Sequence, residues 1–446
     1  MTGTGKTKRI GQALLAAIVA ATSLGMTAGS AQADSEYGCH NLAFSEMLPA
    51  LEGSEGVFFR IDPDMQLHHW IYEETLAQMG ALSDALAAQG TTLIYAPIPT
   101  KALAMPDHLP PEAADLGYDT DLAISVWETL RDRLAAAGVT TLDARTVLRR
   151  VSIAGEAPFY GTDPRLSLAG IQALSNALAK GLGVPQAEET AAAATPASLV
   201  AGAGTAVHLP SVTRLQLQQE CVETLPHVIA PPAPSRTAAS TAMGVWPGAG
   251  SGRPAADIAI VGTEIAVDPA LNFARYAAAA TGATTESYAV PGDDPFAAIA
   301  AYLTAPDFRE RRPRFLVWAD PIWLPLGQNG DRPMRELIAA VGNACTTGIP
   351  LAQSAERRVR ADLSDLPADA SLTLQFDAAS SGVRRFAFHF LSADGQRRTR
   401  WAIRPNQTAA TPRVFMPLSG LWPEGAAAVE IEMDAAPGSA ARLTLC

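Results

Sequence analysis

Residues 257–272, DIAIVGTEIAVDPALN, constrain the fold of this chain more than any other stretch. A short apolar run ends at Gly262 and Thr263, and a helical pattern opens at Asp268. A buried strand, a tight turn and a helix start form the repeating unit of open α/β folds, which bind ligands at the carboxyl ends of their strands. Glu264 lies in the turn. We therefore expect Glu264 at such a ligand-binding edge.

Helical patterns alternate with short apolar runs on both sides of that stretch. We expect helices over residues 67–88, 122–137, 166–182, 269–280, 295–303 and 333–341. We expect strands over residues 92–97, 139–143, 257–261, 284–288 and 314–318. This alternation predicts a mainly parallel sheet that is covered by helices on both faces.

Beyond Cys345 the hydrophobic period changes to two. Strands are expected over residues 371–377, 384–391, 399–404, 413–417, 427–433 and 441–445, which predicts a β-sandwich. The chain is too long for one core, so we expect an α/β domain at 34–345 and the sandwich at 346–446. Two stretches inside the first domain, 186–206 and 230–255, are rich in Ala, Pro, Gly, Ser and Thr. They predict surface loops or flexible linkers.

The N-terminus predicts export. Lys6, Lys8 and Arg9 precede an apolar run over 10–26, and Ala31-Gln32-Ala33 forms a cleavage pattern. We interpret residues 1–33 as a secretory signal peptide, which implies a periplasmic protein; an uncleaved anchor is the alternative. No later stretch approaches the roughly 20 apolar residues that a membrane-spanning helix needs, so we expect no transmembrane segment after cleavage.

Four cysteines remain after that cleavage, and an oxidising compartment would pair them. Four cysteines allow three connectivities. Pairing within each domain gives the bridges Cys39–Cys221 and Cys345–Cys446. A metal site is disfavoured because the cysteines and histidines lack the close spacing of zinc ligands.

The charge of the chain argues against nucleic acid as a partner. The formal net charge is −12, and no basic stripe is present. The sandwich region differs from the rest, since it carries eleven arginines against ten acidic residues. This asymmetry indicates the region where an anionic polymer would bind.

Short motifs in a fixed order make the chain resemble the alginate O-acetylation proteins of the AlgX/AlgJ type. Those motifs are Glu55–Phe59, Pro97–Lys101 with Pro106 and Leu109-Pro110, Thr162-Asp163, Val261–Thr263 with Asn272-Phe273, and Phe315–Trp318 with Pro321. The resemblance covers nearly the whole mature chain. It implies a circularly permuted SGNH-hydrolase domain, a flavodoxin-like three-layer fold, followed by a carbohydrate-binding sandwich. The cysteine layout also matches the two bridges within domains that such proteins carry.

The residues at the family's catalytic positions depart from its Asp-His-Ser pattern. Asp163 matches the aspartate, but Arg165 stands at the histidine position and Glu264 at the serine position. The later Trp-Glu of the family is Trp318-Ala319 here. Arginine suits paired carboxylates, so we expect Arg165 to bridge Asp163 and Glu264. The alternatives are an unrelated surface cluster and a glycosidase pair made by the two carboxylates.

Other polar residues give weaker indications. Arg397, Thr399 and Trp401 alternate along one strand and predict a uronate-binding face, as in the family's carbohydrate-binding module; the alternative is that Trp401 belongs to the core. We expect Lys101 to be solvated, although it could line the cleft. The adjacent His68 and His69 are expected on a helix, and His108 is expected beside a turn. We expect all three to be surface or capping residues.

The resemblance implies a component of exopolysaccharide biosynthesis and O-acetylation, with an acidic polysaccharide and secretion or acetylation proteins as partners and no cofactor. Our first hypothesis is a catalytically degenerate member that binds or guides the polymer. The alternative is an active polysaccharide O-acetyltransferase or acetylesterase that uses other residues.

Overall fold

The computed structural model describes residues 35–183, 207–234, 246, 255–328, 330–342, 345–369, 371–380 and 382–446. The expected signal peptide, the stretch 186–206 and most of 230–255 lie outside these residues. The described chain forms one parallel sheet with helices and two antiparallel sheets that share a separate core. The mixed α/β architecture with a C-terminal β-sandwich is therefore confirmed.

The parallel sheet has five strands in the order β4-β3-β7-β5-β6. Every neighbouring pair is parallel, as expected. The three central strands are almost entirely buried, which explains their apolar sequences. The bounds are β3 (Thr92–Ile98), β4 (Thr140–Thr141), β5 (Ile258–Thr263), β6 (Thr285–Val290) and β7 (Phe315–Pro321).

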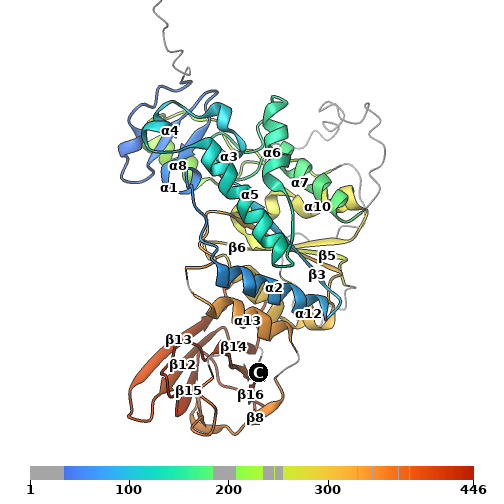
Figure 1. Ribbon diagram of the computed structural model, residues 1–446, viewed down its shortest axis with the longest axis vertical. Helices are drawn as coiled ribbons and strands as arrows, with labels where there is room; N and C mark the ends of the chain where they lie inside the picture. Colours follow the sequence, from blue (N-terminus) through green and yellow to red (C-terminus); the bar gives the residue numbers. More distant parts are fainter. Residues whose placement is uncertain are drawn as a thin grey trace, which may run out of the picture.

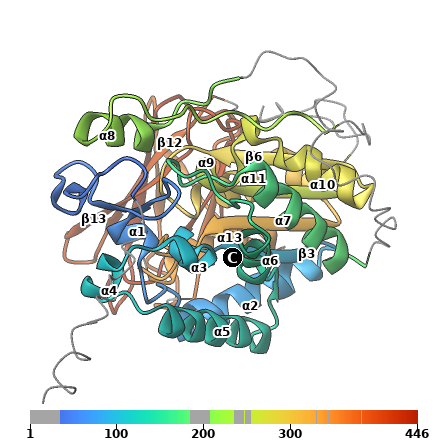
Figure 2. The ribbon, with the colours of Figure 1, turned by 90° about the horizontal axis from the view of Figure 1, so that it is seen from above.

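Helices cover both faces of this sheet (Figures 1 and 2). One face carries α2 (Glu73–Ala87), α11 (Ala297–Thr304) and α13 (Arg332–Val341), and the other carries α6 (Ala144–Ile153), α7 (Leu168–Gly181) and α10 (Phe273–Thr281). Further helices are α1 (Ile61–Asp64), α3 (Lys101–Ala104), α4 (Glu112–Asp115), α5 (Thr120–Ala136), α8 (Val212–Glu220), α9 (Glu264–Val267) and α12 (Pro306–Glu310). A short hairpin of β1 (Ala50–Glu52) and β2 (Phe58–Arg60) precedes them.

Several expected boundaries were wrong. The first long helix begins at Glu73 rather than at residue 67, so the adjacent histidines precede it. The strand expected over 139–143 is cut to two residues because the side chain of Asp143 caps α6, which was not expected. The helix expected over 269–280 is divided at Asn272, whose φ of 59° is left-handed. A short 3₁₀ turn over Pro269–Leu271 precedes α10.

The C-terminal region consists of two antiparallel sheets packed on each other. The strand orders are β13-β12-β15-β10-β9 and β14-β11-β16-β8. All six expected strands are present, with small boundary shifts: β11 (Thr373–Asp377), β12 (Arg385–Leu391), β13 (Arg397–Ile403), β14 (Arg413–Pro417), β15 (Ala428–Met433) and β16 (Arg442–Leu445). Three further strands were not expected: β8 (Thr347–Ile349), β9 (Ala352–Ala355) and β10 (Arg358–Asp362). Strand β9 is fully exposed and shows no apolar alternation, so only pairing with β10 reveals it.

The sandwich packs against the helical layer formed by α2 and α13 (Figure 1). Among the described residues, polar side chains make contacts across this junction. Arg404 Nη2 lies 2.5 Å from Glu336 Oε1, and Thr411 Oγ1 donates to the carbonyl of Thr304 at 2.9 Å. In addition, the hydroxyl of Ser419 donates to Asp331.

Both expected disulfides are present. Cys39–Cys221 ties the N-terminal segment to the end of α8, and Cys345–Cys446 closes a separation of 101 residues across the sandwich. Each bridge therefore fastens an end of the described chain. None of the helices in the described ranges is long and apolar enough to cross a membrane.

Candidate functional site

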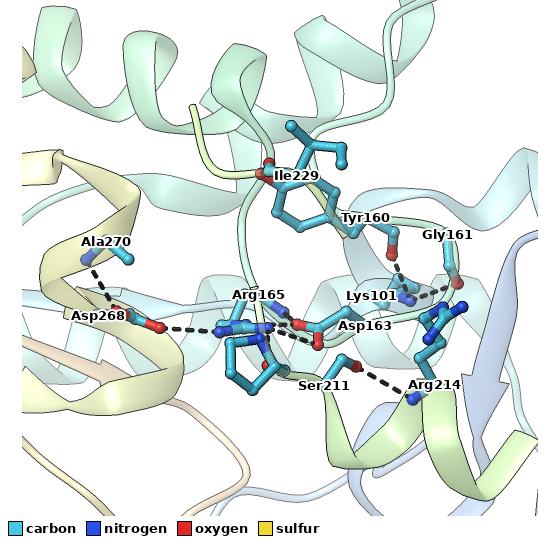
Figure 3. Close-up of polar contacts among 11 residues, drawn as sticks. Lys101, Tyr160, Gly161, Asp163, Arg165, Ser211, Arg214, Ile229, Asp268 and Ala270 are labelled. Atoms are coloured by element: carbon cyan, nitrogen blue, oxygen red, sulfur yellow. Dashed lines mark hydrogen bonds and ion pairs between the residues drawn. The ribbon is translucent and has the colours of Figure 1, made fainter. Parts of the chain in front are cut away.

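The side chain of Arg165 joins two carboxylates near the carboxyl edge of the parallel sheet (Figure 3). Its Nε and Nη2 donate to the two oxygens of Asp163 at 2.8 and 3.0 Å. Its Nη1 donates to Oδ2 of Asp268 at 2.8 Å, and Nη2 also reaches the carbonyl of Pro210 at 2.7 Å. The side chains of Arg165, Asp163 and Asp268 are only 10%, 4% and 13% exposed. This buried ion-pair network holds three separate segments together.

Local backbone contacts orient both carboxylates. Asp163 Oδ1 accepts the backbone N–H of Arg165 at 2.9 Å, in a turn closed by the N–H of Tyr160, which donates to the carbonyl of Arg165. Asp268 Oδ1 accepts the N–H of Ala270 and so caps the turn that follows α9. Each carboxylate is therefore oriented by its own segment as well as by the guanidinium.

The expected pairing of Arg165 with Glu264 is wrong, since Asp268 is the second carboxylate. Glu264 follows β5 directly as the first residue of α9, and its side chain is exposed. Asp268 comes one helical turn later, and at that spacing the two residues share a face. Partial burial and the charge of Asp268 raise the pKa of Glu264, while Arg165 opposes that change. Glu264 thus lies beside the network but outside its hydrogen bonds.

A close approach between strands requires the glycine that precedes this turn. A Cβ atom on Gly262 would lie 1.9 Å from the carbonyl oxygen of Ala319 in β7, which no side chain can tolerate. Gly262 therefore lets β5 and β7 approach at the edge from which Glu264 emerges.

Lys101 is buried, so the expectation of a solvated lysine is wrong. It is 2% exposed, and its Nζ donates to the carbonyls of Phe58, Tyr160 and Gly161 at 3.0, 2.9 and 3.0 Å. Figure 3 shows the bonds to Tyr160 and Gly161. These bonds use all three donors of the ammonium group. Burial, partly opposed by the charge of Asp64, lowers the pKa of Lys101 to about 8. Lys101 therefore fixes the turn that precedes Asp163.

The sequence interpretation also overlooked a buried acid that forms no ion pair within the described residues, Asp320. Asp320 in β7 is 0% exposed, and neither carboxylate oxygen has a hydrogen-bond partner within the described residues. Burial, together with Asp294, raises its pKa well above the usual range. A lone aspartate inside the apolar run FLVWADP was the available signal. The signal for Asp268 was weaker, since an Asp-Pro pair usually indicates only a helix start.

The histidines take no part in the Arg165 contacts. His69 is largely buried and lies 6.2 Å from the ring of Trp127, and burial lowers its pKa to about 4. His108 is the last residue of a short 3₁₀ helix over Pro106–His108, and its Nδ1 lies 3.4 Å from the hydroxyl of Ser54. The described residues contain no group of three or more potential metal ligands of the His, Cys, Asp or Glu type.

On the sandwich, Arg397, Thr399 and Trp401 lie along β13 and are all exposed. Trp401 is 56% exposed, so the alternative that it belongs to the core is wrong. Thr399 Oγ1 lies 2.9 Å from His389 Nδ1, and the guanidinium of Arg385 lies 5.9 Å from the centre of the Trp401 ring. The three residues share one face as expected, and their role in binding sugar stays a prediction.

The fold and the site define a class of protein: an α/β domain of the SGNH-hydrolase type joined to a β-sandwich. The residues at the family's catalytic positions, Asp163, Arg165 and Glu264, lie near the carboxyl edge of the sheet. Residues 50–321 match the family model described as "SGNH hydrolase-like domain, acetyltransferase AlgX". Because this match covers more than half of the chain, the protein belongs to that family.

Two relatives support the assignment. A protein from Pseudomonas fluorescens named "Probable alginate O-acetylase AlgJ" is 25% identical over 317 residues, which are 63% of this chain and 75% of the relative. The structure of AlgX from Pseudomonas aeruginosa superposes with a TM-score of 0.66 at 19% identity. That superposition covers 93% of this chain and 98% of AlgX, so the likeness of fold extends through the sandwich.

Proposed function

We propose that this protein is an exported, periplasmic component of alginate-like exopolysaccharide O-acetylation that binds the acidic polymer without transferring acetyl groups at the Arg165 site. Membership of the acetyltransferase AlgX family supports the pathway, as do the names of the two relatives. The two disulfides fit an oxidising compartment. Its partners would be the polysaccharide and the other proteins that acetylate or secrete it.

The protonated guanidinium of Arg165 is the observation that supports a protein without acetyl-transfer activity at this site. Acyl transfer by a serine requires a neighbouring base that accepts the serine proton. A guanidinium remains protonated in proteins and only donates hydrogen bonds. Here its donors are already directed at Asp163, Asp268 and the Pro210 carbonyl. Arg165 therefore stabilises the loop and cannot serve as a general base.

The carboxylates offer no replacement for the missing base and nucleophile. Both oxygens of Asp163 accept hydrogen bonds from Arg165, so this carboxylate is occupied by the guanidinium. A glycosidase needs two carboxyl groups that act together on the substrate, and Asp163 is already bound by Arg165 through both oxygens. The site supports a structural ion-pair network in the place of a reaction centre.

The exposed face of β13 supports polymer binding. An indole at Trp401 offers a stacking surface for a sugar ring, and Arg397 offers a cation for a uronate carboxylate. Both side chains are presented by a strand, which is a rigid element. We expect Trp401→Ala to weaken binding of a mannuronate hexasaccharide roughly ten-fold, which corresponds to about 1.4 kcal/mol. Isothermal titration calorimetry measures this change.

An esterase assay tests the non-catalytic assignment. We expect the wild-type protein and Asp163→Ala to hydrolyse p-nitrophenyl acetate no faster than an inert protein at the same concentration. Turnover by the wild type that Asp163→Ala abolishes would overturn the proposal in favour of an active acetyltransferase or esterase. The variant Arg165→His with Glu264→Ser is the positive control, because it restores the family's residues at both positions.

A further inference from the structure

Two adjoining hollows follow β13 where the sandwich meets the helical layer. The first, of about 510 Å³, is lined by Trp401 and the adjacent part of β13 together with the first turns of α11 and α13. The second, of about 520 Å³, lies between β13, the start of α13 and the loop after β14. Arg332, Thr399 and Arg400 line both. The two hollows therefore form one groove along an edge strand of the sandwich.

Three arginines meet in the second hollow: Arg332 from α13, and Arg398 and Arg400 from β13. Residues 398 and 400 alternate with the face that carries Arg397, Thr399 and Trp401, so they belong to the other side of the strand. The cluster therefore lies across β13 from the face that carries Trp401, and the first hollow, which both Arg400 and Trp401 line, connects the two.

Neutral groups fix two of these guanidiniums. Arg398 Nη1 donates to the carbonyls of Gly420 and Leu421, and Arg400 donates to those of Pro417 and Ser419 at 2.5 Å. Carbonyl oxygens orient a guanidinium but do not cancel its charge. Both arginines are consequently held in place with their positive charges retained.

The hollow contains little negative charge to balance the cluster. Asp331 is its one acidic lining residue within the described ranges, and that carboxylate already pairs with Arg335 and accepts the hydroxyl of Ser419. Arg332 is exposed and forms no ion pair with any of the described residues. Burial and the neighbouring charges of Arg332 and Arg398 lower the pKa of Arg400 to about 10. The cluster thus carries an excess of positive charge that an anion would relieve.

The start of α13 adds to this field. Arg332 is the first residue of that ten-residue helix and lines the hollow, so the positive end of the helix dipole lies beside the same region. The end of the helix reinforces the arginines in favouring an anion.

We propose that the hollow lined by Arg332, Arg398 and Arg400 binds a carboxylate of an acidic sugar chain that continues along the groove to Trp401. This inference rests on the proposed function, because it takes the polymer as given and adds a second anchoring point for it. The groove would hold one uronate at the arginines while a neighbouring sugar stacks on the indole. The guanidinium fork suits a planar carboxylate.

Calorimetric titration of the full mature protein with a mannuronate hexasaccharide tests the site. Arg332→Gln removes an exposed side chain and should leave the melting temperature unchanged. We expect it to weaken binding about ten-fold, since a charge-assisted hydrogen bond contributes about 1.5–3 kcal/mol. The matched control is Arg360→Gln, an exposed arginine in β10 outside the groove, which should bind like the wild type.

The outcomes separate the two proposals. Equal affinity of Arg332→Gln and Arg360→Gln, with binding lost in Trp401→Ala, would overturn this site and leave the proposed function standing. Failure of the wild type to bind the hexasaccharide at all would overturn both. A third titration uses inorganic phosphate alone. If phosphate bound as tightly as the hexasaccharide and depended equally on Arg332, the site would take free anions and the polymer assignment would fail.

Discussion

Replacing the buried Arg165 by methionine should destabilise the α/β domain more than the same replacement of an arginine that pairs with an exposed carboxylate. Methionine keeps much of the volume of the stem but removes the cation. The change leaves Asp163 and Asp268 facing each other across the former guanidinium, with side chains that are 4% and 13% exposed. Removing one partner of a buried pair costs about 3–5 kcal/mol, because a charge remains uncompensated. Total stabilities are only about 5–15 kcal/mol.

The matched control is Arg149→Met. Arg149 also forms a two-pronged pair, with nitrogen–oxygen distances of 2.7 and 2.9 Å to Asp107, but the Asp107 side chain is 63% exposed. Water can solvate Asp107 after the change, so the expected cost is about 0–1 kcal/mol. The two variants therefore compare similar geometry at different burial.

Urea denaturation followed by circular dichroism measures both costs. A variant that combines Arg165→Met with Asp163→Asn and Asp268→Asn should recover part of the loss, because it removes both stranded charges. If Arg165→Met and Arg149→Met lost the same free energy within about 0.5 kcal/mol, the network would not be a buried structural element, and the case against catalysis would lose its physical basis.

Two further predictions concern other parts of the fold. Asp320→Asn should stabilise the protein at neutral pH. The raised pKa keeps Asp320 protonated in the folded state, whereas in the unfolded chain the same carboxyl group ionises near pH 4. The free energy of unfolding of the wild type therefore falls as the pH rises above about 4, by about 1.4 kcal/mol per pH unit until the folded pKa is reached. Melting temperatures at pH 5 and pH 7 should show a smaller pH dependence in the variant, and identical dependence would contradict the assignment. Cys446→Ser opens a bridge with a separation of 101 residues, for which the chain-entropy model gives about 4.7 kcal/mol. Limited proteolysis should then cleave the sandwich before the α/β domain, and equal resistance of both regions would refute the prediction.

The sequence determined the order and type of the main elements. Apolar runs such as that of β5 are buried on both faces, and a run of this kind indicates a parallel sheet from its composition alone. The cysteine pairing also followed from the sequence: Cys39 and Cys221 both lie well inside the expected α/β domain, whereas Cys345 directly precedes the expected sandwich that contains Cys446. The unusual residues Arg165 and Glu264 were visible because the surrounding motifs fixed their positions.

The tertiary structure decided which charges meet. The sequence predicted a pair between Arg165 and Glu264. In the structure Asp268, which follows the single turn of α9, is the carboxylate that binds the guanidinium. Lysine is a residue type that usually lies on the surface, and Lys101 can be buried because three carbonyl groups from distant segments accept hydrogen bonds from its Nζ. The arginine groove likewise depends on the packing of β13 against the start of α13. Local pattern predicts the elements, since backbone geometry repeats along the chain, whereas contacts between side chains from separate elements depend on how those elements pack.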